Sequence, residues 1–288
     1  MESRRNVQPP FRVQCLAAPG VLAGAFIRMR FFAILFLVFS AVPAFAQGGP
    51  PLLTTDPGTP GPENLEINIG IMPILRQDAK LVQLPQLDIN YGVGQRIQLT
   101  VEVPFVWQSS ASAPNFTNWG NTFVGVKYRF FDHGEDGLQI SVFPQFEIRG
   151  SREAVSHGVA DPGNRLLFPV EFTRKFGPVH LNLETGYYFQ LNSPASHNER
   201  FFALAAGHDV TKKLEVIGEV FNDWVLGAMP KDTTFDAGFR YTLHRSFIVL
   251  FMAGRSFSPN STGQPEFISY GGIQILLDKN GSAFHKPD

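Results

Sequence analysis

Hydrophobic and polar residues alternate one by one along many segments of this chain, and this pattern constrains the fold more than any other feature. In the segment 96–107, Ile97, Leu99 and Val101 fall on one side, whereas Gln98 and its polar counterparts fall on the other. A helix turns by about 100° per residue and would mix the two groups, but an extended strand keeps them apart. The alternation therefore predicts long β-strands with one apolar face and one polar face.

Twelve segments of the chain share this alternation and are predicted to be strands. They are 64–75, 80–91, 96–107, 119–131, 138–149, 166–176, 179–191, 200–210, 214–222, 233–243, 246–257 and 266–277. Strands of soluble proteins average about 5–6 residues, whereas a strand that crosses a bilayer needs about 9–11 residues. The predicted lengths favour a membrane-spanning β-barrel.

The connections between these segments fall into a short set and a mostly longer set. The short connections are 92–95, 132–137, 177–178, 211–213 and 244–245, and the longer ones are 108–118, 150–165, 192–199, 223–232 and 258–265. Short periplasmic turns and longer extracellular loops are typical of bacterial outer-membrane barrels. The sequence therefore predicts an all-β fold, a transmembrane antiparallel barrel of about twelve strands with both ends on the short-turn side.

The positions of the few polar residues on the apolar face support a barrel whose apolar face points toward lipid. Arg174, His208, Asn222 and Arg255 all lie near predicted strand ends, where a charged group on the lipid side costs only about 0–1 kcal/mol. The near-zero net charge of −1 excludes the basic field of a nucleic-acid-binding protein. A soluble exported lipid-binding barrel, with the apolar face turned inward, stays open as the rival fold.

Residues 1–46 are predicted to be a cleavable signal peptide. Arginines precede the apolar run 31–39, and the small-residue sequence 44–46 ends in a cleavage site before Gln47. The position of Met29, directly before the second flanking arginine, suggests that translation starts there. The signal predicts export, and with the barrel pattern it predicts the bacterial outer membrane as the location.

The mature chain is predicted to have three parts: a Pro/Gly-rich arm at 47–63, the barrel at 64–277 and a polar tail at 278–288. The arm is a candidate plug for a narrow lumen, since twelve strands enclose more space than the roughly eight of a filled barrel.

Three stretches of sequence resemble a known family. LTTDPGTPGPENLEINIG begins at Leu53, LPQLDINYGVGQRIQLTVEVPF at Leu84 and GNTFVGVKYRFFD at Gly120. They are similar to blocks of the outer-membrane family named for the meta-pathway of phenol degradation. The resemblance implies an outer-membrane barrel that the assembly machinery inserts and that moves small, often aromatic, solutes, with outer-membrane lipid around it.

The polar face of the predicted strands supplies the candidate functional residues. The candidates for a lumen lining are Glu66, Asp88, Arg96, Glu102, Lys127, Arg129, Glu147, Arg149, Glu171, Glu184, Glu219, Asp236 and Arg240. Charged linings select solutes in channels, although opposite charges on neighbouring strands also pair and fill the space. Phe123, Phe143 and Tyr188 on the same face are candidates for an aromatic track.

These features predict passive passage of a small solute, without enzyme activity, catalytic residues, metal or cofactor. No HExxH or phosphate-loop motif occurs in the sequence. Two alternatives stay open: a structural envelope barrel, and an outer-membrane lipid hydrolase in which His208 acts at the rim.

Terminal sequencing tests the predicted processing. We expect the protein isolated from outer membranes to begin at Gln47 and the unprocessed precursor to begin at Met29. A mature chain that retains the run 31–39 would contradict the cleavage site, and a precursor peptide from 1–28 would contradict the later start.

Overall fold

The computed structural model describes residues 49–111, 114–134, 136–192, 197–226, 232–257 and 265–282. The predicted signal peptide lies outside these residues. The elements are β1 (Leu65–Leu75), β2 (Ala79–Val93), β3 (Ile97–Ser110), β4 (Phe116–Trp119), β5 (Thr122–Asp132), β6 (Gln139–Val142), β7 (Gln145–Ile148), α2 (Arg152–Ser156), β8 (Arg165–Phe176), β9 (Val179–Gln190), β10 (Glu199–Thr211), β11 (Leu214–Val225), β12 (Asp232–His244), β13 (Phe247–Ser256) and β14 (Phe267–Leu277).

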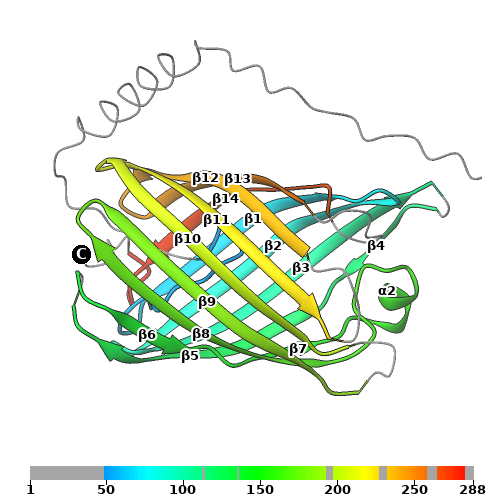
Figure 1. Ribbon diagram of the computed structural model, residues 1–288, viewed down its shortest axis with the longest axis horizontal. Coiled ribbons are helices and arrows are strands. Elements are labelled where there is room, and N and C mark those ends of the chain that lie inside the picture. Colours follow the sequence, from blue (N-terminus) through cyan, green and yellow to red (C-terminus); the bar gives the residue numbers. More distant parts are fainter. Residues whose placement is uncertain are drawn as a thin grey trace, which may run out of the picture. The chain divides into compact units, whose positions relative to one another are not determined.

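The strands form one antiparallel sheet that closes on itself. Most strands pair with their neighbours in sequence, and β1 pairs with β14, from Leu65 opposite Leu277 to Leu75 opposite Phe267. β4 and β5 together pair with β3, and β6 and β7 together lie between β5 and β8. The fourteen segments therefore build a closed barrel of twelve strands, which confirms the predicted fold class (Figure 1).

Two of the predicted strands are interrupted, which corrects the expectation of unbroken strands at 119–131 and 138–149. The first break separates β4 from β5, and the second separates β6 from β7 at Phe143 and Pro144. Proline has no N–H to give to a ladder. The wall is held across the second gap by Phe143 N–H, which donates to Pro169 O (3.1 Å), and by Val126 N–H, which donates to Pro144 O (3.0 Å).

The connections differ between the two ends of the barrel. Tight turns follow β2, β8, β10 and β12 at one end, whereas the connection that contains α2 lies at the other end beside β4 (Figure 1). α2 begins after Ser151, whose Oγ accepts a hydrogen bond from Ala154 N–H (3.0 Å). Among the described residues, no helix is long and apolar enough to cross a membrane.

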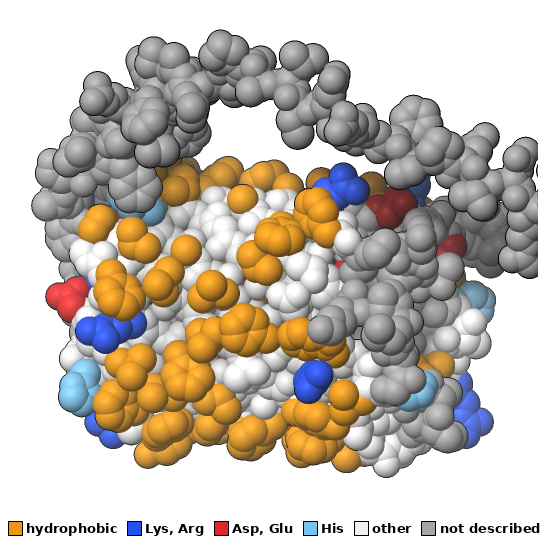
Figure 2. Space-filling model, in the orientation of Figure 1, with side chains coloured by type: hydrophobic (Ala, Val, Ile, Leu, Met, Phe, Trp, Pro, Cys, Tyr) orange, Lys and Arg blue, Asp and Glu red, His pale blue; other side chains and the backbone are white. Residues whose placement is uncertain are grey.

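The apolar face of the wall points outward. In β3, Leu99 and Val101 are 44% and 42% exposed, whereas their neighbours Gln98 and Thr100 are each 7% exposed. Hydrophobic side chains accordingly spread over the visible wall (Figure 2). A soluble barrel would bury these side chains, so the rival with inward apolar faces is wrong.

The lumen also holds an apolar core, which the sequence analysis did not predict. The core lies on the inner side of β1, β13 and β14 and consists of Met72, Leu250, Met252, Ile268 and Tyr270. These strands contribute apolar side chains on both faces, so the interior is partly filled by hydrophobic packing. The polar lining therefore comes mainly from the remaining strands, with contributions from parts of β1 and from Gln274 on β14.

Glycines at the core make room for the ring of Tyr270. A Cβ on Gly272 would lie 2.7 Å from Tyr270 Oη and 2.8 Å from the carbonyl oxygen of Ile69. A Cβ on the adjacent Gly271 would meet only Ile71 Cγ2, at 3.9 Å. The two glycines lie on the same strand, but only Gly272 lacks room for a Cβ. They therefore form a matched pair for testing the packing around Tyr270.

We expect Gly272→Ala to destabilise the barrel by about 1–3 kcal/mol, the usual effect of overpacking, and Gly271→Ala to leave it nearly unchanged. The measurement is the temperature at which the compact barrel band shifts to the unfolded band on a gel. Equal shifts for both variants would show that the Tyr270 packing is not tight.

Candidate functional site

The N-terminal arm lies inside the barrel. Thr54, Asp56 and Thr59 are buried, and so are several of the prolines between residues 50 and 60. The arm reaches β1 at the tight-turn end, where Glu63 N–H donates to Gly92 O and Gly92 N–H donates to Asn64 O, both at 2.9 Å. The predicted arm therefore occupies the lumen that the strands enclose.

Two inward glutamates hold the backbone of the arm. Glu219 on β11 accepts hydrogen bonds from Leu53 N–H (2.8 Å) and from Thr54 N–H (2.9 Å), and also from the Thr54 hydroxyl. Glu184 on β9 accepts from Thr55 N–H (2.7 Å). Hydrogen bonds to a charged acceptor are about twice as strong as neutral ones, so these contacts are the main polar anchors of the arm.

The carbonyl groups of the arm are held by two basic side chains from the wall. Arg240 on β12 donates to Gly49 O (2.9 Å) and to Pro50 O (3.2 Å). Lys127 on β5 donates to Asp56 O and forms an ion pair with Glu171 on β8 (3.3 Å). Donors and acceptors from opposite sides of the barrel thus satisfy an irregular backbone that has no ladder of its own.

Close backbone contact fixes the point where the arm leaves the lumen. A Cβ on Gly92 would lie 1.7 Å from the carbonyl oxygen of Gly61, so only glycine fits there. Gly61 itself has a φ of +84°, in the region that glycine populates readily. The Asn64 side chain donates to Pro60 O at 2.9 Å and closes this bend.

The structure places most of the predicted lining residues inside the barrel. The buried ones are Glu66, Asp88, Lys127, Glu147, Glu171, Glu184, Glu219, Asp236 and Arg240. Glu102 and Arg129 are half-buried. Arg96 and Arg149 are exposed, since Arg96 lies in the β2–β3 turn and Arg149 follows the end of β7. These two arginines therefore do not join the inner group.

Ion pairs connect strands that are adjacent or one strand apart in the wall. Arg240 on β12 lies 3.3 Å from Glu215 on β11, its register partner. Arg165 on β8 pairs with Glu147 on β7 and lies 3.4 Å from Glu199 on β10. Arg165 was not among the predicted lining residues, because the predicted strand began one residue later, at 166. Leu167 and Glu171 point inward, and Arg165 is an even number of residues from both. This alternation would have placed Arg165 on the inner face.

The three predicted aromatic residues line one cavity between the arm and the wall. The cavity has a volume of about 350 Å³, and Phe123, Phe143 and Tyr188 contribute to it together with Phe201 and Phe221. The ring centroid of Phe201 lies 5.8 Å from that of Tyr188 and 5.5 Å from that of Phe221. Phe201 and Phe221 were not among the predicted aromatic residues. Phe201 could have been found, because it alternates in step with the small residues that face inward on β10.

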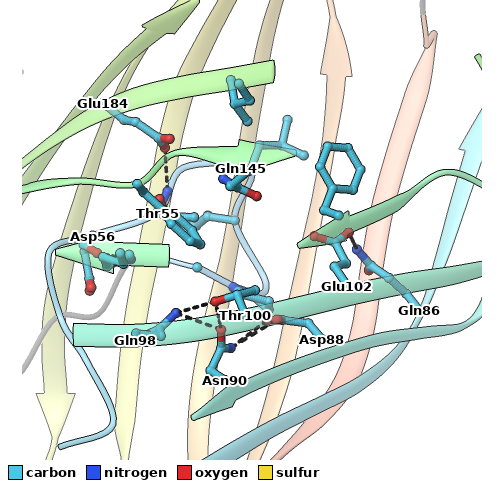
Figure 3. Close-up of a pocket in the computed structure, with 18 of the residues that line it drawn as sticks. Thr55, Asp56, Gln86, Asp88, Asn90, Gln98, Thr100, Glu102, Gln145 and Glu184 are labelled. Carbon is cyan, nitrogen blue, oxygen red and sulfur yellow. Dashed lines mark hydrogen bonds between the residues drawn. The ribbon is translucent and has the colours of Figure 1, made fainter. Parts of the chain in front are cut away.

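The opposite wall of the cavity is polar and comes from β2 and β3. Asp88 accepts two hydrogen bonds from Asn90 Nδ2 (3.1 and 3.0 Å), and Glu102 accepts one from Gln86 Nε2 (3.0 Å). Gln98 donates to Asn90 Oδ1 at 2.7 Å. Figure 3 shows these carboxylates and amides grouped on adjoining strands of the pocket. The cavity therefore joins an aromatic wall to an acid-and-amide wall.

The candidates for chemistry elsewhere do not form a catalytic arrangement in the described part of the chain. Ser156 Oγ lies 3.3 Å from His157 Nδ1, but the same nitrogen lies 3.0 Å from the backbone oxygen of Glu153, and the ring stacks on Phe116. His208 lies on the outward parity of β10. Within the described ranges, no group of three or more His, Cys, Asp or Glu residues is placed to hold a metal ion.

Comparison with known proteins gives a likeness of fold. The sequence matches no protein-family model and no curated protein, so the family resemblance of the three sequence blocks stays a prediction. An outer membrane channel from Pseudomonas putida F1 is similar in structure, with a TM-score of 0.64 and 10% identity over 83% of this chain and 100% of that chain. The NanC porin is similar with a TM-score of 0.51 and 9% identity over 73% of this chain and 98% of that chain. The chain thus has the fold of outer-membrane β-barrel channels.

Removing the Lys127 charge tests the internal ion pairs. We expect Lys127→Met to destabilise the barrel by about 3–5 kcal/mol, because Glu171 stays buried without its cation. The measurement is urea unfolding in detergent micelles. Arg96→Met is the matched control, since Arg96 is exposed, and a loss of similar size in the control would contradict the proposed cause.

Proposed function

We propose that this protein is a bacterial outer-membrane channel for passive movement of a small solute, and that the N-terminal arm holds it closed. The observation that carries the proposal is the arm inside a polar lumen, anchored by Glu219, Glu184 and Arg240. These anchors are hydrogen bonds and not covalent links, so the arm is able to leave without breaking the wall. No chemical step is needed for such a function.

The outer surface supports the membrane placement in this proposal. Large apolar side chains are exposed along the wall, and aromatic residues are exposed near strand ends, such as Trp107 and Phe189 at one end and Phe176 and Tyr241 at the other. Aromatic girdles at both interfaces are typical of outer-membrane barrels. The sheet also closes on itself through the pairing of β1 with β14, which suits a lipid environment because backbone groups are then paired within the wall.

The aromatic wall of the cavity supports an apolar or aromatic portion in the solute. This is the solute class that the family resemblance implies, and the wall supplies five rings to contact it. A purely structural envelope barrel would need neither a cavity of this kind nor a separable arm. The lipid-hydrolase alternative makes a distinct prediction, namely lipid hydrolysis that is lost in His208→Ala.

Deletion of the arm provides the direct test of a closed channel. We expect a variant that lacks residues 49–59 to show higher conductance in planar bilayers than the full chain, since the arm fills the lumen. A folded deletion variant with the conductance of the full chain would overturn the proposal. The heat-dependent gel shift verifies that both proteins are folded.

A single substitution gives a milder version of this test. We expect Glu219→Gln to increase the frequency of open events, because the NH2 group that replaces one carboxylate oxygen cannot accept a hydrogen bond from the arm. Glu153→Gln in the exposed α2 is the matched control and should behave like the unmodified protein. Unchanged gating in Glu219→Gln would show that Glu219 is not an anchor of the closed state.

A further inference from the structure

The cavity beside the arm has two unlike walls, and we propose that it binds an organic cation that joins a protonated amine to an aromatic or alkyl body. The inference rests on the proposed channel function and names the class of solute. The cavity volume of about 350 Å³ falls in the range of about 300–1,000 Å³ that is usual for small-molecule sites.

Two carboxylates of the polar wall have no basic partner in the described part of the chain. Asp88 and Glu102 are held by the amides of Asn68, Asn90 and Gln86, and neither forms an ion pair with a lysine or arginine there. By contrast, two buried carboxylates on the other side of the lumen have such partners: Glu147 has Arg165, and Glu215 has Arg240. A cation near Asp88 and Glu102 would supply the missing opposite charge.

The same wall has more hydrogen-bond acceptors than donors. Asn68 on the neighbouring β1 does not itself line the cavity, but it is fully buried and donates from Nδ2 to Asp88 (2.9 Å), while its Oδ1 has no partner among the described residues. Oε1 of Gln86, which lines the cavity, is likewise a buried acceptor without a partner there. An ammonium group carries three donors and no acceptor, which fits a surplus of this kind.

The charges that line the cavity favour a cation over an anion. Asp56, Glu66 and Glu184 line it in addition to Asp88 and Glu102. Among the described residues that line the cavity, Lys127 is the only one with a basic side chain, and its ammonium is already engaged by Glu171 and by the backbone of Asp56. A free anion would therefore meet an acidic wall and no available cation.

The aromatic wall accounts for the body of the proposed ligand. Tyr188, Phe201 and Phe221 come from three adjacent strands and lie in a row. Phe123, the register partner of Glu102, and Phe143 also line the cavity. Aromatic faces contact apolar groups and also attract cations, by about 0.5–2 kcal/mol, so both parts of the ligand are favoured.

Three probes of nearly the same shape test the charge requirement on the unmodified full-length barrel in detergent. They are 2-phenylethylammonium, the neutral 2-phenylethanol and the anionic phenylacetate, and binding is measured by titration calorimetry. We expect the ammonium compound to bind at least about tenfold more tightly than either analogue, a difference of about 1.4 kcal/mol. Equal affinity for the three probes, or preference for the anion, would overturn the proposal.

Substitution of the two carboxylates tests where the ammonium binds. We expect Asp88→Asn with Glu102→Gln to weaken the ammonium probe by about tenfold or more and to leave phenylethanol nearly unchanged. Glu153→Gln on α2 is the matched control. If the double variant does not fold, the single variants and the probe series still decide the question.

The two proposals fail in different ways in these experiments. Binding is measured at equilibrium with the arm in place, whereas the channel is tested by conductance after the arm is removed. An arm-deleted barrel that conducts, together with a cavity that ignores the charge of the probe, would refute only the cation site. Charge-selective binding with no conductance would refute only the channel.

Discussion

The closed ladder of backbone hydrogen bonds between β1 and β14 is the constraint on which the rest of this structure depends. The outer face of the wall exposes Leu99, Val101 and many similar side chains, which suits lipid. Lipid offers no hydrogen-bond partners to backbone N–H and C=O groups, so these groups must pair within the wall. Closure satisfies those groups within the wall, and the outer face is then free to be apolar. The polar residues of the alternation are left to face the lumen, where they must be neutralised by one another or by something inserted.

The arm is suited to this task by its composition. An irregular segment inside a barrel brings backbone N–H and C=O groups that need partners, and Pro50, Pro51, Pro57 and Pro60 each bring one donor fewer. The N–H groups of residues 53–55 donate to Glu219 and Glu184, and carbonyl groups of the arm accept hydrogen bonds from Arg240 and Lys127. The lumen charges thus serve as partners for the arm as well as for each other, which explains why so many of them are buried together.

Much of the fold was predictable because period two is a local property. Ten of the twelve predicted strands are continuous, the other two are each divided into two shorter strands, and most of the predicted lining residues are buried in the lumen. Some predictions were wrong for local reasons. Arg96 and Arg149 fall in connections just beyond strand ends, and Pro144 breaks its predicted strand while β7 continues the wall. The apolar core around Tyr270 was not predicted because its strands are apolar on both faces, so their pattern does not show which residues pack inside. The cavity joins β2 and β3 to β9, β10 and β11, and no spacing in the sequence indicates that approach.

The sequence by itself determined the number of strands, the two faces of most of them and the positions of the tight turns, because alternation and turn residues act between neighbours in the chain. Only the tertiary structure decided that the apolar face points outward, since alternation reads the same whichever face is inside. It also decided that the arm lies in the lumen, where Thr54 meets Glu219 across 165 positions of the chain. It alone separated the carboxylates with basic partners from Asp88 and Glu102, because that difference depends on which strands face each other across the barrel.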